Sequence, residues 1–280
     1  MRVLITGAAG RIGSSIAERL AQDHDVIGLD VRGGPYTSVI GSITDAQLID
    51  DLCSRVDAVV HTAALHAPHV GFVPDSDFRR TNLLGTQVLL RGSLRGPVTR
   101  FIYTSTTSLY GQAMVSNDRA VWVTEELEPV PRDIYDETKI AAEGECATAA
   151  RAGLPCIALR MSRCFPEPQD LMAIYRLYRG VDPRDVAHAH ALALTSDLKG
   201  FHVFNISAAT PFQPEDTQEL LSNAGRVILR YYPWAEREFA RRGWQLPESI
   251  DRVYAIEKAQ EMLAYTPEYN FPSLFDTGVA

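Results

Sequence analysis

The 280-residue sequence predicts an α/β fold, in which a doubly wound parallel sheet carries helices on both faces and a small C-terminal lobe is added. Short apolar runs of strand length alternate with segments of helical period over residues 1–160, which is the rhythm of repeated strand–helix–strand units. The run 57–64 is apolar on both faces, as expected for a strand that helices cover on both sides. Hydrophobic residues make up 46% of the chain, which is enough to bury such a core.

Each predicted element has its own signal in the sequence. The apolar run 2–6 meets the glycine-rich turn 7–13, and a segment of helical period follows, so the chain opens as strand, turn and helix. A polar, proline-rich stretch over 112–133 is expected to be a loop. In chain order, the sequence predicts strands at 2–6, 25–30, 38–40, 57–64, 100–111 and 155–160, with helices at 14–23, 45–52, 75–94 and 135–152.

The rhythm is less regular after residue 160. A helix is predicted at 185–195, a strand at 200–207, and a late helix at 256–265 that ends before Pro267. No clean linker separates this part from the first half. We therefore expect a lobe that is intertwined with the sheet and supplies its last strand at about 201–206, rather than an independent domain.

Composition and charge exclude several classes of protein. The net charge of −8 argues against a nucleic-acid partner, which requires a basic footprint. No apolar run reaches transmembrane length, and the N-terminus lacks the layout of a signal peptide, so no membrane partner is expected. The four cysteines are Cys53, Cys146, Cys156 and Cys164. They form no Cys-x-x-Cys pair, which favours free thiols in the cytoplasm over a disulfide or a zinc site.

The segment "GAAGRIG" carries the first functional signal. Gly7, Gly10 and Gly13 lie between the first strand and its helix, where glycine permits close approach of a diphosphate and the helix N-terminus offers free N–H groups. Asp30 ends the second strand, in the position that accepts hydrogen bonds from an adenosine ribose. The Asp30 carboxylate favours NAD, whereas Arg11 and Arg32 would suit the extra phosphate of NADP. We expect NAD, with NADP as the weaker alternative.

The segment "IYDETKIAAEGE" places Tyr135 and Lys139 four residues apart on a predicted helix. Both side chains then project from one face, and a cation there would stabilise a tyrosinate and make Tyr135 a proton carrier. Taken alone, the pattern is more typical of a lysine that merely pairs across one turn with Glu143.

The motifs together resemble a known family. The segments "TGAAGRIG", "DAVVHTAA", "TNLLGT", "FIYTSTTSLYG", "YDETK" and "VDPRDVAHAHALAL" are similar to those of extended short-chain dehydrogenases/reductases of the NAD-dependent epimerase/dehydratase type. The resemblance implies a Rossmann-type domain over 1–160 that binds the dinucleotide and a substrate lobe over 161–280. It also implies that Tyr135 exchanges the substrate proton, that Lys139 holds the nicotinamide ribose and lowers the pKa of Tyr135, and that the Thr106 hydroxyl contacts the same substrate oxygen.

The resemblance extends to residues around the cofactor and the substrate. Ser42 stands where the family often has an adenine-binding aspartate, and Asn82 is an unfavourable mid-helix residue for which a hydrogen-bonding role is expected. His66 is expected to make a polar contact rather than to bind a metal, so no metal ligand is predicted. The expected cofactor contacts are Gly7, Gly10, Arg11, Ile12, Gly13, Asp30, Ser42, Ile43, Ala63, Ala64, Asn82, Thr104, Tyr135 and Lys139, and the expected substrate contacts are His66, Thr107, Ser108 and Arg163. For Thr107 and Ser108, ordinary capping of backbone groups explains the hydroxyls nearly as well.

The substrate is less well determined than the reaction class. The chain passes from Pro168 to "GVDPRD" in about a dozen residues, where family members that act on nucleotide sugars carry a longer insertion. The segment "RMSRCFPEP" (160–168) partly resembles uronate dehydrogenases, which oxidise free sugar acids. The match is incomplete, because Thr107 and Ser108 replace an Asn-His pair and Met172 replaces the carboxylate-binding arginine, for which Arg163 or Arg176 could substitute.

Three functions remain open from the sequence. The first is an NAD-dependent oxidoreductase for a small sugar or sugar acid, the second is an epimerase that keeps its cofactor, and the third is an NAD-binding sensor without turnover. The absence of acids at 107 and 108 argues against a sugar dehydratase, which needs an acid and a base there. The resemblance further implies a homodimer that pairs through the helices at 75–94 and 135–152.

Overall fold

The computed structural model describes residues 1–275, so the last five residues of the expected 161–280 region lie outside the described residues. It contains a seven-stranded sheet in the order β3-β2-β1-β4-β5-β7-β8, and every neighbouring pair is parallel. The strands are β1 (Arg2–Thr6), β2 (Asp25–Asp30), β3 (Val39–Ile40), β4 (Ala58–His61), β5 (Arg100–Thr106), β7 (Cys156–Met161) and β8 (Phe201–Ile206). The predicted doubly wound, Rossmann-type sheet is confirmed.

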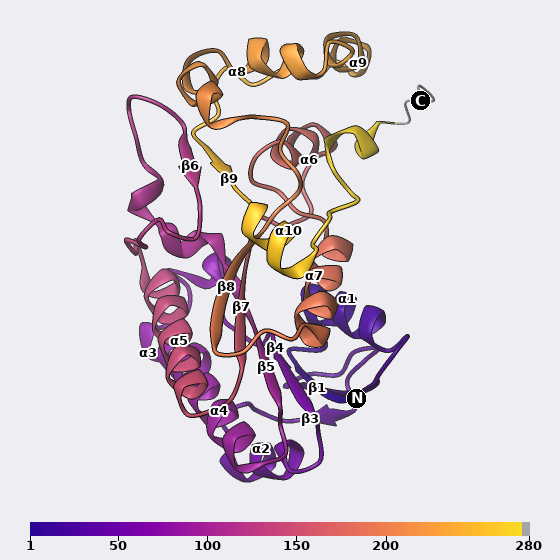
Figure 1. Ribbon diagram of the computed structural model, residues 1–280, viewed down its shortest axis with the longest axis vertical. Coiled ribbons are helices and arrows are strands. Elements are labelled where there is room, and N and C mark those ends of the chain that lie inside the picture. The colour runs from indigo at the N-terminus through magenta and orange to yellow at the C-terminus, as the bar shows by residue number, and fades with distance from the viewer. Residues whose placement is uncertain (276–280) are drawn as a thin grey trace.

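Helices cover both faces of the sheet (Figure 1). Along β1, Val3 and Ile5 pack toward one helical layer, while Leu4 packs toward the other, because successive side chains of a strand point to opposite faces. The first layer contains α1 (Arg11–Leu20), α7 (Pro183–Thr195) and α10 (Glu257–Leu263), and the second contains α2 (Ala46–Cys53), α4 (Gly85–Arg95) and α5 (Ile134–Arg151). This double cover explains why the strands are apolar on both faces.

The predicted helix at 75–94 is interrupted. It divides into α3 (Asp75–Phe78), a π-helical turn over Arg79–Leu84 and then α4. The π turn contains the buried Asn82, whose side-chain amide hydrogen-bonds to the backbone of Leu65 on a neighbouring loop. A wider turn of this kind is rare and often marks a functional site. Hydrophobic spacing alone does not reveal it.

The strand predicted at 57–64 ends early, and the segment 100–111 runs from a strand into turn residues, as expected. β4 stops at His61 and β5 stops at Thr106, after which residues 107–110 form a 3-10 turn. The Thr106 hydroxyl accepts a hydrogen bond from the Ser108 backbone N–H at 3.1 Å, which caps this turn. After both strands, the polypeptide therefore leaves the sheet at its carboxyl edge, where parallel α/β sheets bind ligands.

The lobe holds elements that the sequence did not predict. These are α6 (Gln169–Arg176), α8 (Thr217–Tyr231), α9 (Ala235–Arg242), and a two-stranded parallel ribbon of β6 (Val121–Val123) and β9 (Arg252–Tyr254). β6 lies within the expected loop 112–133, so a segment of the first half completes the lobe. Buried aromatic residues fill the lobe core, among them Phe212, Phe239 and Phe271. Figure 1 shows α8 and α9 at the end of the molecule that lies beyond α6 and β9.

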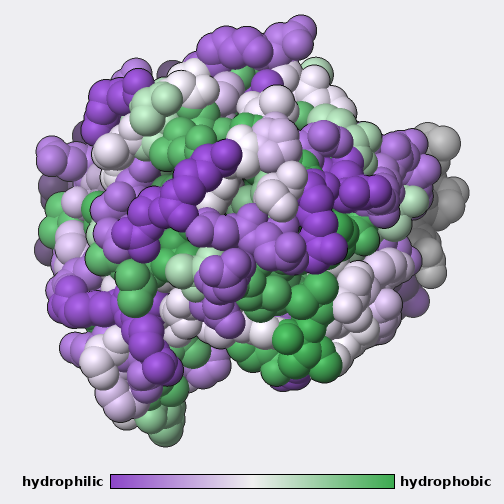
Figure 2. Space-filling view, turned by 90° about the horizontal axis from the view of Figure 1, so that it is seen from below, coloured by the Kyte–Doolittle hydropathy of each residue, from purple (hydrophilic) through white to green (hydrophobic). Residues whose placement is uncertain are grey.

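Hydrophilic residues predominate on the face of the molecule that points downward in Figure 1. In the view from below, hydrophobic residues form separate patches between hydrophilic ones (Figure 2). Within residues 1–275, none of the helices combines the length and the apolar character that crossing a membrane requires.

Candidate active site at the carboxyl edge of the sheet

A cavity of about 1020 Å³ opens along the carboxyl ends of the strands. It runs from the glycine turn to the start of α5. Residues that follow β7 and residues of β9 form the wall opposite these elements. The predicted residues that line it are Gly7, Gly10, Arg11, Ile12, Gly13, Asp30, Ser42, Ile43, Ala63, Ala64, His66, Thr104, Thr106, Thr107, Ser108, Tyr135, Lys139 and Arg163. Asn82 is the predicted site residue that does not line it.

The glycine turn fits the diphosphate of a dinucleotide. Gly7 has a φ of 74°, and a Cβ atom at Gly13 would lie 2.1 Å from the Gly7 carbonyl oxygen. The α1 helix starts against this turn with Gly10 as its N-cap, and no side chain caps it. The N–H groups at the positive end of the helix therefore face the cavity and suit a phosphate anion.

The adenosine end of the cavity is built around Asp30. Its carboxylate accepts hydrogen bonds from the backbone N–H groups of Ala9 at 3.0 Å and Arg32 at 3.1 Å, which fixes its orientation beside the glycine turn. The Ser42 hydroxyl lies 2.8 Å from that of Thr44 and lines the same end. Asp30, which is expected to bind the adenosine ribose, and Ser42, which stands at the expected adenine position, thus line the same end of the cavity.

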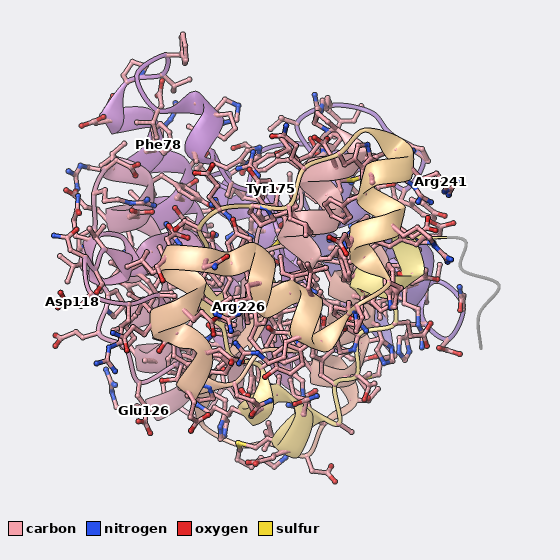
Figure 3. All side chains as sticks on the ribbon, turned by 90° about the horizontal axis from the view of Figure 1, so that it is seen from above. Phe78, Asp118, Glu126, Tyr175, Arg226 and Arg241 are labelled. Atoms are coloured by element: carbon pink, nitrogen blue, oxygen red, sulfur yellow. The ribbon has the colours of Figure 1, made fainter. Side chains whose placement is uncertain are left out.

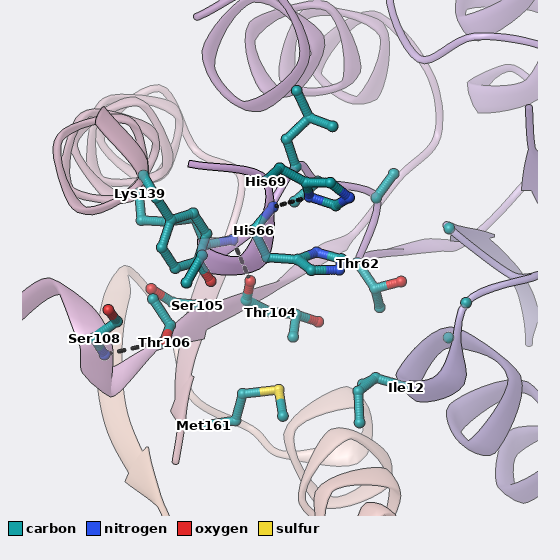
Figure 4. A pocket seen from close by; sticks show the side chains of 18 of the residues that line it. Ile12, Thr62, His66, His69, Thr104, Ser105, Thr106, Ser108, Lys139 and Met161 are labelled. Carbon is teal, nitrogen blue, oxygen red and sulfur yellow. Dashed lines mark hydrogen bonds between the residues drawn. The ribbon is translucent and has the colours of Figure 1, made fainter. Parts of the chain in front are cut away.

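Thr106, Tyr135 and Lys139 meet at the opposite end of the cavity. Thr106 ends β5, while Tyr135 and Lys139 lie in the first turns of α5, whose N-cap Asp133 accepts the Asp136 N–H at 3.0 Å. The Lys139 ammonium donates to the Thr104 carbonyl oxygen at 2.7 Å and lies 4.3 Å from the centroid of the Tyr103 ring (Figure 4). These two contacts hold the Lys139 side chain in place where it lines the cavity.

Burial shifts the pKa values of the two helical residues. It raises the pKa of the Tyr135 phenol, and the hydrogen bond with the Thr106 hydroxyl opposes that rise. Burial also lowers the pKa of Lys139 to about 8, although the Glu143 carboxylate acts in the other direction. The Glu143 carboxylate pairs with Arg160 at 2.6 Å instead of with Lys139, and it acts on Lys139 only through its charge.

A chain of hydrogen bonds supports Lys139 from behind the sheet. His190 of α7 donates from Nδ1 to the Val186 carbonyl oxygen at 2.7 Å, since that oxygen can only accept. Its Nε2 therefore accepts from the Thr104 hydroxyl at 2.8 Å, and the Thr104 carbonyl in turn accepts from Lys139. Burial lowers the pKa of His190 to about 4, so the imidazole is neutral near pH 7. No motif in the sequence connects α7 with the site.

Asn82 holds the loop that contains Ala63 and Ala64. Its amide donates to the Leu65 carbonyl oxygen at 2.8 Å and its Oδ1 accepts the Leu65 N–H at 2.8 Å. A third hydrogen bond, at 3.1 Å, reaches the Thr138 hydroxyl on α5. The expected hydrogen-bonding role of Asn82 is confirmed, but its partners are protein groups, and it supports the cavity wall instead of lining it.

His61 supports the same loop from the sheet. Its Nδ1 lies 2.7 Å from the Thr6 hydroxyl and its Nε2 lies 2.9 Å from the Thr86 hydroxyl. The Thr86 hydroxyl donates to the Asn82 carbonyl oxygen at 2.6 Å, so His61 Nε2 must be the donor to Thr86. Burial lowers the pKa of His61 to about 3, which keeps the ring neutral. Within residues 1–275, no group of three His, Cys, Asp or Glu residues is arranged to hold a metal ion.

The predicted substrate residues line the cavity, but protein partners already engage the side chains of two of them and the backbone of a third. Ser108 donates to the buried Asp136 carboxylate at 2.7 Å, and Arg163 forms an ion pair with Glu167. The backbone N–H of His66 donates to Nδ1 of His69 at 3.1 Å. Arg176, the other candidate for binding a carboxylate, pairs with Asp182 at 3.0 Å and does not line the main cavity.

Sequence reasoning missed the residues that the lobe contributes. Arg179 follows α6, Arg252 and Tyr254 come from β9, and Met114 comes from the expected loop 112–133. No short-range pattern marks them, because they reach the cavity only through the pairing of β6 with β9 and the return of the chain after α6.

Known proteins resemble this chain along nearly its whole length. A dTDP-glucose 4,6-dehydratase of Streptomyces antibioticus is 28% identical over 97% of this chain and 89% of its own. Among solved structures, a UDP-glucuronic acid 4-epimerase from Bacillus cereus, in complex with UDP-glucuronic acid and NAD, superposes with a TM-score of 0.71 at 21% identity, covering 98% of this chain and 96% of its own. A mutated uronate dehydrogenase superposes with a TM-score of 0.71 at 18% identity, covering 97% and 83% respectively.

At such identities the two structures show a shared fold, whereas the family follows from the sequence. The family described as "NAD dependent epimerase/dehydratase family" matches residues 3–171, which include the glycine turn, Asp30, Thr106, Tyr135 and Lys139. This chain therefore belongs to the NAD-dependent epimerase/dehydratase family, a group of extended short-chain dehydrogenase/reductase enzymes.

Proposed function

We propose that this enzyme transfers hydride between NAD and a hydroxyl or carbonyl carbon of a small sugar or sugar acid. The observation that carries the proposal is the convergence of Thr106, Tyr135 and Lys139 at one end of a cavity whose other end is the glycine turn. A cofactor anchored at that turn and extended along the cavity would bring its reactive ring to this group. NAD supplies the hydride acceptor when it is bound, and the side chains handle the proton.

The three side chains divide the work. Tyr135 exchanges the proton of the substrate oxygen, and its raised pKa makes it a neutral proton donor in the reducing direction. The Thr106 hydroxyl holds the same oxygen and favours the tyrosinate that oxidation requires. Lys139 donates hydrogen bonds to the ribose hydroxyls while its contact with Thr104 keeps it in position.

A small substrate is supported by the segment after β7. The chain proceeds from β7 through the eight-residue helix α6 to α7, which leaves little protein to hold a nucleotide. The structural likeness to a uronate dehydrogenase agrees with a free sugar acid, whereas the other two relatives are named for nucleotide sugars. The lack of an acid at Thr107 and Ser108 favours hydride transfer without loss of water.

An epimerase is the second candidate, favoured by the fold shared with the UDP-glucuronic acid 4-epimerase. It would use the same three side chains but return the hydride to the opposite face of the carbon. Net formation of NADH separates the two reactions. A sensor without turnover has no need of the complete Thr106, Tyr135 and Lys139 set, which counts against it.

The test is NADH absorbance on addition of NAD and a panel of free sugars, sugar acids and nucleotide sugars. Tyr135→Phe removes the proton carrier and keeps the ring, so turnover should fall by about a thousandfold or more while NAD affinity stays within a few-fold. Tyr232→Phe, in the lobe, is the matched control and should retain wild-type turnover. Unchanged turnover in Tyr135→Phe would rule out this mechanism.

We further propose a homodimer that pairs through the segments 75–94 and 135–152. Leu84 and Leu94 are 40% and 42% exposed on the first of these, which leaves apolar surface for a partner helix. Sedimentation at micromolar concentration is expected to show a dimer, and a monomer there would contradict the proposal.

We also propose a cytoplasmic location, which the four buried cysteines support because all of them are free thiols. The chain is further proposed to divide into a cofactor domain (1–160) and a substrate lobe (161–280).

A further inference from the structure

The lining of the cavity is positively charged, whereas the chain as a whole is negatively charged. Its lining contains one acid, Asp30, at the adenosine end, and eight cations, whereas the chain carries a net charge of −8. The cations are Arg11, Arg32, Arg80, Arg132, Lys139, Arg163, Arg179 and Arg252. A pocket of one sign inside a protein of the other sign concentrates ligands of opposite charge, which here means anions.

Four of these eight cations are already paired with protein carboxylates. Arg132 pairs with Asp136 at 3.1 Å, and Arg80 pairs with Asp77 at 3.5 Å. Arg163 and Arg252 pair with the carboxylates of Glu167 and Asp251. Among residues 1–275, the lining arginines that form no ion pair are Arg11, Arg32 and Arg179. The first two belong to the glycine turn and to the adenosine end, so they serve the cofactor.

Arg179 lies instead beside the reacting end. Thr106 is in register with Met161 on β7, and two residues later Arg163 forms a parallel bridge with Gly180. The Arg163 backbone N–H donates to the Arg179 carbonyl oxygen at 2.9 Å, which fixes the Arg179 backbone next to this strand end. Arg179 is therefore held beside the extension of β7, between the residues that follow β7 and those that follow β8, and it lines the same cavity as Thr106.

The Arg179 side chain is held by rings and not by acids. Its guanidinium carbon lies 5.0 Å from the centroid of the Tyr175 ring and 5.9 Å from that of the Tyr178 ring, and its Nε is buried without a hydrogen-bond partner. The positive charge of Arg179 also acts on the Asp251 carboxylate. Burial raises the pKa of Asp251, but the hydrogen bond from Arg252 and the charges of Arg252 and Arg179 outweigh burial and lower this pKa below its usual value. That carboxylate is already engaged by Arg252. The rings orient the guanidinium without an ion pair, the Tyr178 hydroxyl engages one of its donors, and its remaining terminal N–H groups stay available to a ligand.

We propose that Arg179 anchors a single carboxylate of the substrate, so that the enzyme acts on free sugar acids and discriminates against neutral sugars. This inference rests on the proposed function and adds the substrate class and a residue that selects it. One unpaired guanidinium at the reacting end matches one negative charge. A diphosphate would bring two, for which the substrate end offers no second unpaired arginine within the described residues. The forked donors of arginine suit the two oxygens of a carboxylate.

The test is calorimetric titration of the NAD-saturated protein with D-glucuronate and D-galacturonate, with D-glucose and D-galactose, and with UDP-glucose. We expect the acids to bind more tightly than the neutral sugars and UDP-glucose. Arg179→Gln should weaken binding of the acids by about tenfold or more, because a partly desolvated charge pair is lost. Arg179→Lys keeps the charge without the fork and should give an intermediate loss.

The matched control is Arg226→Gln, an exposed arginine on α8 that does not line the cavity (Figure 3). It should bind the acids as the wild type does, and NAD affinity should stay within about twofold in all variants, which shows that the fold is intact. Equal affinity for acids and neutral sugars, tighter binding of UDP-glucose, or acid binding unchanged by Arg179→Gln would each overturn the proposal.

NADH absorbance in the same samples separates the two hypotheses. Binding of acids that depends on Arg179 without NADH formation supports the anchor and counts against net oxidation. NADH formed from neutral sugars, unaffected by Arg179→Gln, supports the proposed function and refutes the anchor.

Discussion

The cofactor half and the lobe of this enzyme are built on different principles. The cofactor half is a parallel sheet whose key residues occur in short motifs, such as Gly7 to Gly13 or Tyr135 to Lys139, and each motif forms its own local geometry. The lobe is assembled from segments far apart in the chain, as when β6 pairs with β9. Its contributions to the cavity, Arg179 and Arg252 among them, exist only once those segments meet.

This difference predicts where each half is sensitive to change. In the cofactor half, the backbone itself forms the binding surface, so there is no room for an added atom. In the lobe, an aromatic core with many ring–ring contacts supports a surface made of side chains. We therefore expect steric substitutions to be severe in the first region and mild in the second.

The largest expected effect is at Gly13. In Gly13→Ala, the added Cβ would lie 2.1 Å from the Gly7 carbonyl oxygen, which must move together with the turn. We expect the free energy of unfolding to fall by about 3 kcal/mol or more and NAD binding to be lost. Urea unfolding and calorimetric titration with NAD measure the two quantities. A variant with wild-type NAD affinity would show that the turn is not the diphosphate site.

An intermediate effect is expected from the two buried neutral histidines, one from each part of the chain. The pKa values of His61 and His190 are about 3 and about 4 in the folded protein, and both return to about 6.5 on unfolding. The unfolded chain therefore binds more protons below pH 6.5, so stability is full above this pH and is lost as the pH falls toward 4. Each histidine should contribute a slope of about 1.4 kcal/mol per pH unit.

His190→Gln isolates one of these contributions. Glutamine retains an acceptor for the Thr104 hydroxyl and a donor for the Val186 carbonyl, but it does not titrate. Urea unfolding at pH 7, 6 and 5 should show a slope shallower by about 1.4 kcal/mol per pH unit than that of the wild type. If both proteins lose stability equally on acidification, the neutral state of His190 is refuted.

The smallest expected effect is the counterpart of Gly13→Ala in the lobe. A Cβ at Gly225 of α8 would lie 3.4 Å from Leu246 Cβ, which is an ordinary contact. Gly225→Ala should therefore raise the free energy of unfolding by about 0.5 kcal/mol, because alanine restricts the unfolded chain and favours the helix. A loss of stability as large as that of Gly13→Ala would remove the contrast between the two regions.

The sequence predicted the parts of the fold that are encoded locally. The strand–turn–helix opening, the doubly wound parallel sheet and the residues of the glycine turn follow from periodicity and motif spacing, and the structure confirms the sheet. The π turn around Asn82 was not predicted, because the hydrogen bonds that accompany it join Asn82 to Leu65, which is 17 residues away in the chain. Arg179 was missed for the same reason, and the burial that raises the pKa of Tyr135 was not foreseen, since burial depends on the whole fold.

The hydrogen-bond chain from Val186 through His190 and Thr104 to Lys139 has a consequence for genetic screens. It passes through the sheet and joins one helical layer to the active-site end of the other. A substitution that shifts α7 by a fraction of an ångström changes where the lysine stands, although α7 lies behind the cavity. Loss-of-function alleles should therefore cluster in the buried face of α7 as well as around the cavity, and many should still produce folded, abundant protein.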